Sequence, residues 1–230
     1  MKKGILYGVG VGPGDPELLT LKAVRVLRQA DVIAAPSTGD GRRTALSIAE
    51  AYVADKPLID CRMPMLRDRS RLEENYDRVA DELSVLLDEG KTVAFITLGD
   101  PSIYSTFTYI HRRMRSRGYD ARFVPGVTSF CAAAAALDTP LCEGGEMLHI
   151  VPSSHDAVET GIDLSGTRVL MKAGRAVQDV CETLKSRGEL EKAGMAECCG
   201  MENEKIYRSM ADFDGEAGYL SIIVVKEHGL

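Results

Sequence analysis

Short apolar runs and longer segments of mixed polarity alternate along the first half of the chain. Such runs, bounded by glycine, proline or charged residues, are typical of buried strands. The five expected strands lie at 5–9, 32–35, 58–60, 92–97 and 121–124. Apolar residues recur at helical spacing between them, at 18–27, 43–53, 72–87 and 103–117. Strand and helix therefore alternate, which predicts a parallel sheet covered by helices.

The pattern changes after Gly126. A tightly packed, alanine-rich helix is expected at 129–137 and a further helix at 177–187. The expected strands of this half lie at 148–151, 169–172, 196–199, 205–209 and 219–225. Because these strands follow one another closely, a mixed sheet is expected. The fold class is therefore α/β, with two α/β domains, residues 1–125 with a parallel-rich sheet and residues 126–230 with a mixed sheet.

The composition of the chain excludes some classes of function. The net charge of −6 over 230 residues argues against nucleic acid as the main partner. The longest apolar runs are too short to span a bilayer, and glycine interrupts the apolar start of the chain, so we expect a cytoplasmic protein with no membrane partner. The six cysteines form no CxxC pair and no metal-ligand spacing with His149 or His155. We therefore expect buried or semi-buried free thiols and no bound metal, and we expect His111 on a solvated helix face.

Three glycine- and proline-rich turns lie where a strand should pass into a helix. They read GVGVGPGDPELLT at 8–20, TLGDPSIYST at 97–106 and VPGVTSF at 124–130. A helix N-terminus offers free backbone N–H groups and a partial positive potential. In open α/β sheets, ligands bind outside the carboxyl ends of the strands. The three turns therefore predict a polar cleft, lined by backbone, for a small ligand.

The first turn does not fit a dinucleotide. The dinucleotide fingerprint needs glycine at i, i+2 and i+5, and the third position is Pro13, Asp15 or Glu17 in the three possible registers. The two carboxylates would also repel a pyrophosphate. A small zwitterionic or cationic cofactor suits acidic turns better. S-adenosylmethionine fits, because it carries a sulfonium and an amino-acid end but no phosphate.

The three motifs together carry a family resemblance. GVGVGPGDPELLT, with GDPSIY and VPGVTS at these distances, resembles the tetrapyrrole methylases, which use S-adenosylmethionine. Within that family, ELLTLKAVRVLRQADVIAAP, the MPM at 63–65, FITLGDPSIYSTF and VPGVTSFCAAAA are most similar to the precorrin-2 C-20 methyltransferases of cobalamin synthesis. The resemblance implies two α/β domains with a ligand cleft between them, a homodimer, and methyl transfer to C-20 of precorrin-2 or cobalt-factor II.

The resemblance also implies site residues. Those implied to contact the cofactor are Val11, Gly99, Asp100, Ile103, Tyr104, Thr128, Ser129, Met171, Leu220 and Ser221. Thr128 and Ser129 would bond its methionine portion, and Met171 would border its adenosine. The substrate side would be formed by the loop Gly12, Pro13, Gly14 and Asp15. No catalytic residue is named, because an electrophilic methyl group and a nucleophilic meso carbon need alignment more than acid–base help.

The connection CRMPMLRDRSR at 61–71 is rich in arginine. Carboxylates prefer arginine, whose fork can bond them bidentately, so Arg67 and Arg69 are candidates for holding the carboxylates on the tetrapyrrole rim. The alternative is an exposed connector with no ligand. In the same way, Asp100 and Thr128 are alternatively helix caps, and Met171 is alternatively a core residue.

Other functions stay open at this point. The same fold could methylate another tetrapyrrole position or diphthamide. A nucleotide-dependent oxidoreductase and a non-catalytic ligand-binding protein are alternatives from other classes, and the failed dinucleotide fingerprint disfavours the former.

Overall fold

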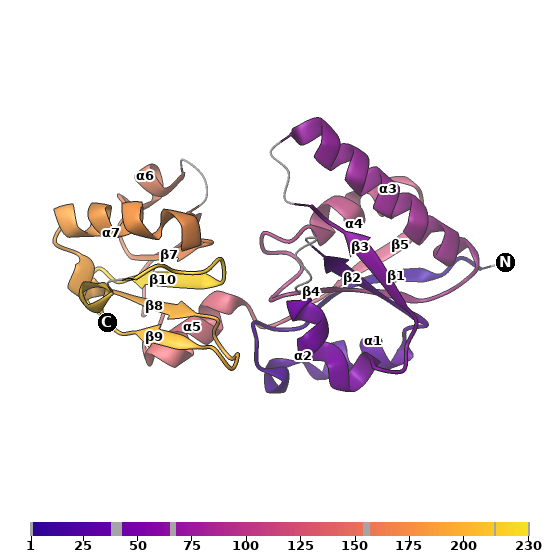
Figure 1. The fold of residues 1–230 in the computed structure, drawn as a ribbon, viewed down its shortest axis with the longest axis horizontal. Coiled ribbons are helices and arrows are strands. Elements are labelled where there is room, and N and C mark those ends of the chain that lie inside the picture. Colours follow the sequence, from indigo (N-terminus) through magenta and orange to yellow (C-terminus); the bar gives the residue numbers. More distant parts are fainter. Residues whose placement is uncertain (1, 38–42, 65–67, 154–156, 214, 230) are drawn as a thin grey trace. The chain divides into compact units, whose positions relative to one another are not determined.

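The computed structural model describes residues 2–37, 43–64, 68–153, 157–213 and 215–229. The chain divides into two compact units, Met1–Thr128 and Ser129–Leu230. Each unit contains one five-stranded sheet, drawn in indigo to pink for the first unit and in orange to yellow for the second (Figure 1). In the part of the chain that the structure describes, no helix is long and apolar enough to cross a bilayer.

All strand pairs of the first sheet are parallel, and the spatial order is β3-β2-β4-β1-β5. The strands are β1 (Ile5–Gly10), β2 (Val32–Ser37), β3 (Leu58–Arg62), β4 (Val93–Thr97) and β5 (Asp120–Val124). Gly8 at the middle of β1 pairs with Phe95 on one side and with Phe123 on the other. The parallel sheet predicted from alternating strands and helices is confirmed.

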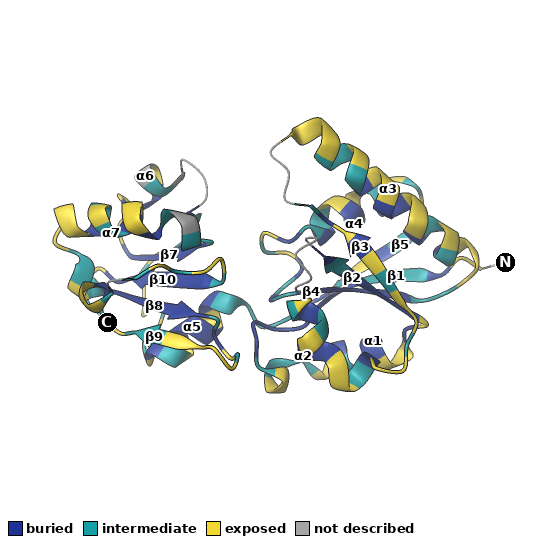
Figure 2. Cartoon of the chain, in the orientation of Figure 1, coloured by how far each residue is buried: buried dark blue, intermediate teal, exposed yellow. Residues whose placement is uncertain are grey.

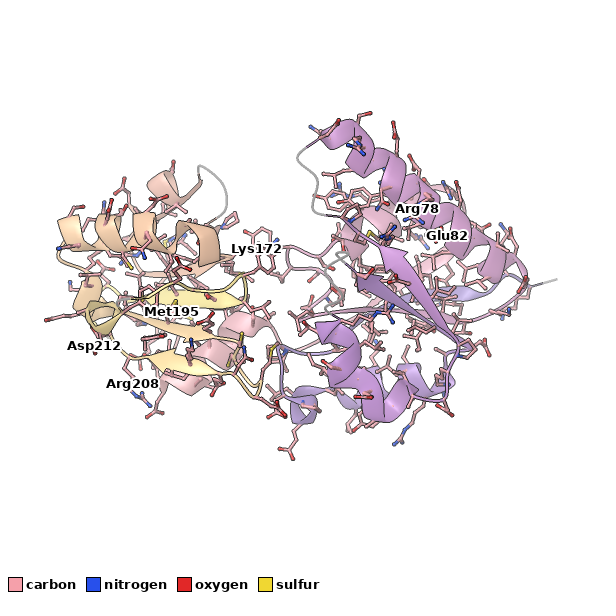
Figure 3. The ribbon with its side chains drawn as sticks, in the orientation of Figure 1. Arg78, Glu82, Lys172, Met195, Arg208 and Asp212 are labelled. Carbon is pink, nitrogen blue, oxygen red and sulfur yellow. The ribbon has the colours of Figure 1, made fainter. Side chains whose placement is uncertain are left out.

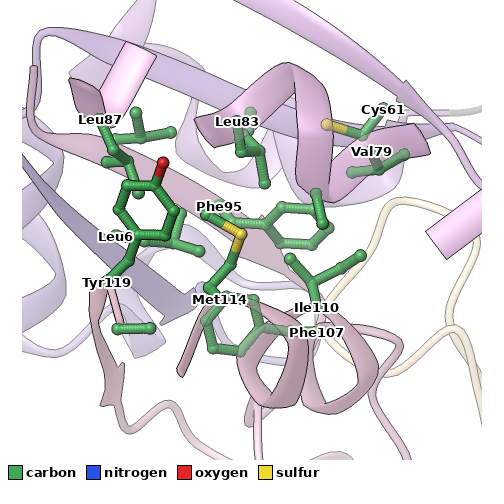
Figure 4. Packing of buried hydrophobic residues seen from close by; sticks show 14 of the residues in the cluster. Leu6, Cys61, Val79, Leu83, Leu87, Phe95, Phe107, Ile110, Met114 and Tyr119 are labelled. Atoms are coloured by element: carbon green, nitrogen blue, oxygen red, sulfur yellow. The ribbon is translucent and has the colours of Figure 1, made fainter. Parts of the chain in front are cut away.

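Helices cover both faces of this sheet. The first face is covered by α1 (Leu21–Gln29) and α2 (Thr44–Val53), the second by α3 (Arg69–Asp88) and α4 (Phe107–Ser116). Beneath α3 and α4, the rings of Phe95 and Phe107 lie 5.4 Å apart in a cluster of buried side chains (Figure 4). A Cβ on Gly8 would lie 2.0 Å from the Phe107 ring, so glycine there lets α4 approach the sheet.

The second sheet is mixed, in the order β6-β7-β10-β8-β9. Its strands are β6 (Leu148–Pro152), β7 (Thr167–Met171), β8 (Ala193–Glu197), β9 (Lys205–Tyr207) and β10 (Ser221–Val225). Only β6 and β7 run parallel, and the other described pairs are antiparallel. The prediction of a mixed sheet is confirmed.

Helices also lie on both faces of the second sheet. α7 (Val177–Ser186) and the short α6 (Ala157–Gly161) pack on the face that carries Leu170, Met195 and Ile223 (Figure 3). The alanine-rich α5 (Ser129–Leu137) contacts β8, β9 and β10 from the other side. The three central strands β7, β10 and β8 are buried throughout, the edge strands β6 and β9 are partly exposed, and the outer faces of the helices are exposed (Figure 2).

Several predicted helix starts were wrong. The first helix begins at Leu21, because the Thr20 hydroxyl accepts the Ala23 amide at 3.1 Å and caps it, while Pro16–Leu18 form a separate 3-10 turn. α4 begins at Phe107, not Ile103, after a turn in which the Ser105 hydroxyl accepts the Phe107 amide at 3.2 Å. The helix α6 was not expected at all.

Candidate functional site

The three glycine-rich turns meet at one edge of the first sheet. β1 lies between β4 and β5, and all three strands run in the same direction. Their carboxyl ends therefore lie side by side, as the sequence predicted. The turns that follow them, at 11–15, 98–106 and 125–128, form the candidate site.

The first two turns are joined by a short antiparallel bridge. The Gly99 amide donates to the Gly12 carbonyl at 2.7 Å, and the Gly12 amide donates to the Gly99 carbonyl at 3.4 Å. Both glycines have left-handed backbone conformations, with φ of 82° and 68°, which side chains disfavour. The bridge therefore depends on glycine at both positions.

The backbone of the third turn packs closely against this bridge. A Cβ on Gly10 would lie 2.5 Å from the Gly99 carbonyl oxygen and 2.7 Å from the Gly126 nitrogen. A Cβ on Gly126 would lie 2.3 Å from the same Gly99 oxygen. Real side chains do not tolerate such distances, so the three turns can close on one another only through glycine.

Asp100 ties the second turn to the third. One carboxylate oxygen, Oδ2, accepts the Gly126 amide at 3.0 Å. The other, Oδ1, accepts the Ser102 amide at 2.8 Å and also the Ser102 hydroxyl. Asp100 does not cap α4, whose N-cap is Thr106. Both carboxylate oxygens of Asp100 thus accept hydrogen bonds within the protein, and Asp100 fixes the position of the two turns relative to each other.

The residues after Asp100 form an unusual turn. The half-buried Ile103 donates its amide to the Asp100 carbonyl at 3.3 Å. Tyr104 has a left-handed backbone with φ of 47°, and its side chain is exposed. A bulky residue in this conformation costs free energy, and such strain clusters at functional sites.

Thr128 carries an unsatisfied polar atom. Its Oγ1 is buried and has no hydrogen-bond partner among the described residues. Buried hydroxyl groups are nearly always bonded, so this oxygen is a candidate for a hydrogen bond to a ligand. Ser129, the next residue, begins α5 and is half-buried. Val11 is fully buried, and its amide donates to the Thr97 carbonyl at 3.0 Å.

The loop at 12–15, which was predicted to face the substrate, is largely buried. Gly12, Pro13 and Gly14 are all buried. Asp15 is half-buried and accepts the Glu17 amide at 2.8 Å, so it caps the 3-10 turn rather than a long helix.

The arginine-rich segment is not a single connector. β3 extends to Arg62, and α3 begins at Arg69 because the Asp68 carboxylate caps the helix at the Ser70 and Arg71 amides. Arg67 lies outside the described residues. Arg69 is exposed, and among the described residues no hydrogen bond or ion pair links it to the three turns.

The predicted residues of the second unit meet at one edge of its sheet. Ile222 pairs with Met171, which places Leu220 and Ser221 next to the end of β7. Met171 is 8% exposed, and the Leu220 carbonyl accepts the Cys198 amide at 3.0 Å. Ser221 is fully buried and donates its hydroxyl to the Gly218 carbonyl at 2.7 Å. Its hydroxyl is therefore used inside the protein.

Sequence reasoning missed two polar groups at this edge. Ser153 Oγ, just after β6, and Glu197 Oε2, at the end of β8, are buried without a partner among the described residues. Neither residue belongs to a recognisable motif, and no pattern in the sequence could have found them. Both lie at the same end of the sheet as Met171. The Ser153 amide donates to the Met171 carbonyl at 2.7 Å, and Glu197 pairs with Ser221, whose neighbour Ile222 pairs with Met171.

Two expectations about titratable side chains need correction. Cys131 and Cys142 are exposed, although buried or semi-buried thiols were expected. Cys61 is buried, and burial raises its pKa to about 12. His111 is not simply solvated, because its ring lies 4.4 Å from that of Phe123 and its Nε2 is 3.2 Å from the Ala121 carbonyl. In the described ranges, no group of three or more metal-ligating side chains comes together.

Comparisons with known proteins agree over nearly the whole chain. The sequence profile of the Tetrapyrrole (Corrin/Porphyrin) Methylases matches residues 5–212. A protein of Methanocaldococcus jannaschii named probable cobalt-precorrin-2 C(20)-methyltransferase is 37% identical, over 96% of this chain and 95% of its own length. The precorrin-2 C(20)-methyltransferase of a Sinorhizobium species is 31% identical, over 96% of this chain and 95% of its own length.

Solved structures share the fold. The crystal structure of uroporphyrin-III-C-methyltransferase from Thermus thermophilus matches with a TM-score of 0.70 and 26% identity, covering 99% of this chain and 93% of that one. A structure of a Thermus thermophilus uroporphyrin-III C-methyltransferase complexed with S-adenyl homocysteine matches with a TM-score of 0.72 and 21% identity, over 97% and 98% of the two chains. Motifs, fold and comparisons agree, and this chain belongs to the tetrapyrrole methylases.

Proposed function

We propose that this protein transfers a methyl group from S-adenosylmethionine to C-20 of precorrin-2 or of its cobalt-loaded counterpart, in cobalamin synthesis. The observation that carries the proposal is the end-to-end match, 95% of the relative's own length, to a protein named for C(20) methylation of cobalt-precorrin-2. The Sinorhizobium relative is named for the metal-free substrate. The proposal therefore covers both forms of the substrate.

The first unit suits a cofactor that is not held by phosphates. The turns at 11–15 and 98–106 carry carboxylates at Asp15 and Asp100, which would repel a pyrophosphate but not a sulfonium or an ammonium group. The orphaned Thr128 hydroxyl supports a hydrogen bond to the methionine portion of the cofactor. Gly99, Ile103 and the strained Tyr104 are proposed to lie against the cofactor, with Val11 beneath them.

The second unit is proposed to contact the adenosine. Met171 and Leu220 are the apolar members of this set, and they would pack against the flat base. Since the Ser221 hydroxyl is engaged by Gly218, Ser221 would act through its backbone and its small size. The Ser129 hydroxyl, at the start of α5, would bond the methionine end.

The chain's own contribution to the chemistry would be orientation. Bound S-adenosylmethionine supplies an electrophilic methyl group. Proper alignment of two reactants is worth up to ~7–11 kcal/mol in favourable cases. Both oxygens of Asp100 are occupied within the protein, so Asp100 is a poor general base. The buried loop Gly12–Gly14 and Asp15 would position the tetrapyrrole, and Arg67 and Arg69 would hold its carboxylates.

We also expect a homodimer and a cytoplasmic location. Light scattering of the purified protein tests the first expectation, and fractionation of the source cells tests the second.

Calorimetry tests the cofactor assignment directly. We expect S-adenosylhomocysteine and S-adenosylmethionine to bind and nicotinamide dinucleotides not to bind. Binding of a nicotinamide dinucleotide without binding of either sulfur compound would replace the proposal by the oxidoreductase alternative.

A further inference from the structure

Glu197 is a buried carboxylate with one oxygen satisfied and one not. It is the last residue of β8 and is 9% exposed. Its Oε1 accepts the Gly218 amide at 2.6 Å. Its Oε2 is buried and has no hydrogen-bond partner among the described residues. A buried carboxylate oxygen without a donor is costly, so a donor supplied by a ligand would stabilise it.

The segment Gly218–Ser221 is held in place by contacts on two sides, and these contacts are called the clamp below. Gly218 donates its amide to Glu197, and its carbonyl accepts the Ser221 hydroxyl at 2.7 Å. The Gly218 carbonyl also lies against Gly174, where an added Cβ would come within 2.4 Å of the oxygen. A Cβ on Gly218 itself would lie 2.8 Å from Glu197 Oε1. Glu197 and the absence of side chains at Gly174 and Gly218 therefore help to fix the position of Gly218–Ser221.

This clamp lies beside the residues proposed to contact the adenosine. Glu197 pairs with Ser221 across the β8–β10 ladder, and Ile222 pairs with Met171 across the β10–β7 ladder. Lys172, which follows Met171, places its Nζ 6.0 Å from the ring centroid of Tyr219, which lies in the segment Gly218–Ser221. Glu197, Met171 and Leu220 therefore share one end of the sheet.

The chemistry of the orphaned oxygen selects one part of the cofactor. A carboxylate oxygen accepts hydrogen bonds from N–H and O–H groups. The nucleoside of S-adenosylmethionine carries such donors in its adenine amine and its ribose hydroxyls. Hydrogen bonds to a charged group are the stronger kind, and they are worth more where water is excluded.

We propose that Glu197 is a binding and positioning residue of this site: one carboxylate oxygen fixes the Gly218–Ser221 segment, and the other accepts a hydrogen bond from the nucleoside of the bound cofactor. This inference rests on the proposed use of S-adenosylmethionine. It adds a residue that the family resemblance did not point to.

Two substitutions separate the two roles. Glu197→Gln keeps the size of the side chain and leaves its amide oxygen to accept the Gly218 amide, but presents an NH2 group in place of the orphaned oxygen. Glu197→Ala removes both carboxylate oxygens and with them both roles. Glu204→Gln is the control, because Glu204 Oε2 accepts the Gly200 amide at 2.6 Å in the next turn, while its side chain is exposed and water can reach it.

Calorimetry with adenosine and with S-adenosylhomocysteine is the test, with thermal unfolding of each variant alongside. We expect Glu197→Gln to weaken the binding of both ligands by about tenfold or more, as the loss of a charge-assisted hydrogen bond does, and to leave the unfolding midpoint near that of the wild type. Glu197→Ala should lose both affinity and stability. Glu204→Gln should keep wild-type affinity.

Two results would overturn this inference alone. One is wild-type affinity in Glu197→Gln, and the other is a loss confined to S-adenosylhomocysteine, which would assign the contact to the amino-acid end. A wild-type protein that binds neither ligand would instead overturn the proposed function and this inference with it.

Discussion

Asp100 and Gly126 are joined by a hydrogen bond in which the Gly126 amide donates to Asp100 Oδ2 at 3.0 Å. The two residues belong to turns after β4 and β5, which are separated in the sheet by β1. The bond therefore spans the turn after β1 and closes the three turns into one structure. The aspartate of the GDP motif thus holds the turns together, and the Asp100–Gly126 hydrogen bond is called the brace below.

Replacement of Asp100 tests the brace. Asp100→Ala leaves the Gly126 and Ser102 amides without their acceptor, and we expect the free energy of unfolding to fall by about 1–3 kcal/mol. The affinity for S-adenosylhomocysteine should fall as well, because the turns lose their mutual position. Urea unfolding and calorimetry measure the two effects. Ser102→Ala, which removes only one hydroxyl donor, should have a smaller effect on both, and unchanged affinity in Asp100→Ala would show that the brace does not matter for binding.

Gly126 offers a test of the close backbone contact. Gly126→Ala would place a Cβ 2.3 Å from the Gly99 carbonyl oxygen, so the turns must separate. We expect a loss of several kcal/mol in unfolding free energy, or failure to fold, as overpacking against rigid backbone produces. Gly145→Ala is the control, since nothing lies within 4 Å of its added Cβ, and it should change stability by no more than about 0.5 kcal/mol. Equal stabilities in the two variants would refute the contact.

Substitution of Thr128 should change the affinity for the cofactor without lowering the stability of the fold. Thr128→Val keeps the shape but removes the orphaned Oγ1, so the free energy of unfolding should stay the same or rise by up to about 1 kcal/mol. The affinity for S-adenosylhomocysteine should fall about tenfold, and Thr128→Ser, which keeps a hydroxyl, should retain most of it. If Thr128→Val lost stability and kept its affinity, the hydroxyl would be structural.

The sequence predicted the sheets well and the helix starts poorly, for a physical reason. Strands such as β4 are recognisable because burial on both faces makes them continuously apolar. Helix starts depend on which side chain caps which amide. Thr20 makes that bond for α1, and the N-cap of α4 is Thr106, without a side-chain bond, whereas Asp15-Pro16 and Asp100-Pro101 look like better caps in the sequence.

The candidate site also has features that the sequence could predict and features that it could not. The meeting of the three turns follows from strand direction, so the sequence could predict it. The bond between Asp100 and Gly126 and the orphaned oxygen of Glu197 depend on contacts between distant segments, and AECCG at 196–200 gives no hint of the latter. Arg69 was singled out by local charge and by the carboxylates of the expected substrate; among the described residues no hydrogen bond or ion pair links it to the turns, and its role stays a prediction.

His111 predicts a pH dependence of stability. Burial against Phe107 and Phe123 lowers its pKa from the ordinary value of 6.5, opposed by its bond to the Ala121 carbonyl and aided by the nearby charge of Arg115. The unfolded chain therefore takes up a proton at a higher pH than the folded chain does. The stabilisation is fully present above pH 6.5 and is lost as the pH falls through the lower folded value.

Urea unfolding between pH 7.5 and pH 5 checks this prediction. The wild type should lose stability over this range more steeply than His111→Gln, which has no ring to protonate. Parallel profiles for the two proteins would show that the folded and unfolded states of His111 have the same pKa.

The central claim is tested most directly by turnover with S-adenosylmethionine that carries an isotopically labelled methyl group. Precorrin-2 and its cobalt-loaded counterpart are each incubated with the enzyme, and the product is analysed by mass spectrometry and by NMR of the labelled carbon. The account predicts one labelled methyl group, attached to C-20, in at least one of the two products. A label at another ring position, or no transfer to either tetrapyrrole by protein that binds S-adenosylhomocysteine, would contradict it.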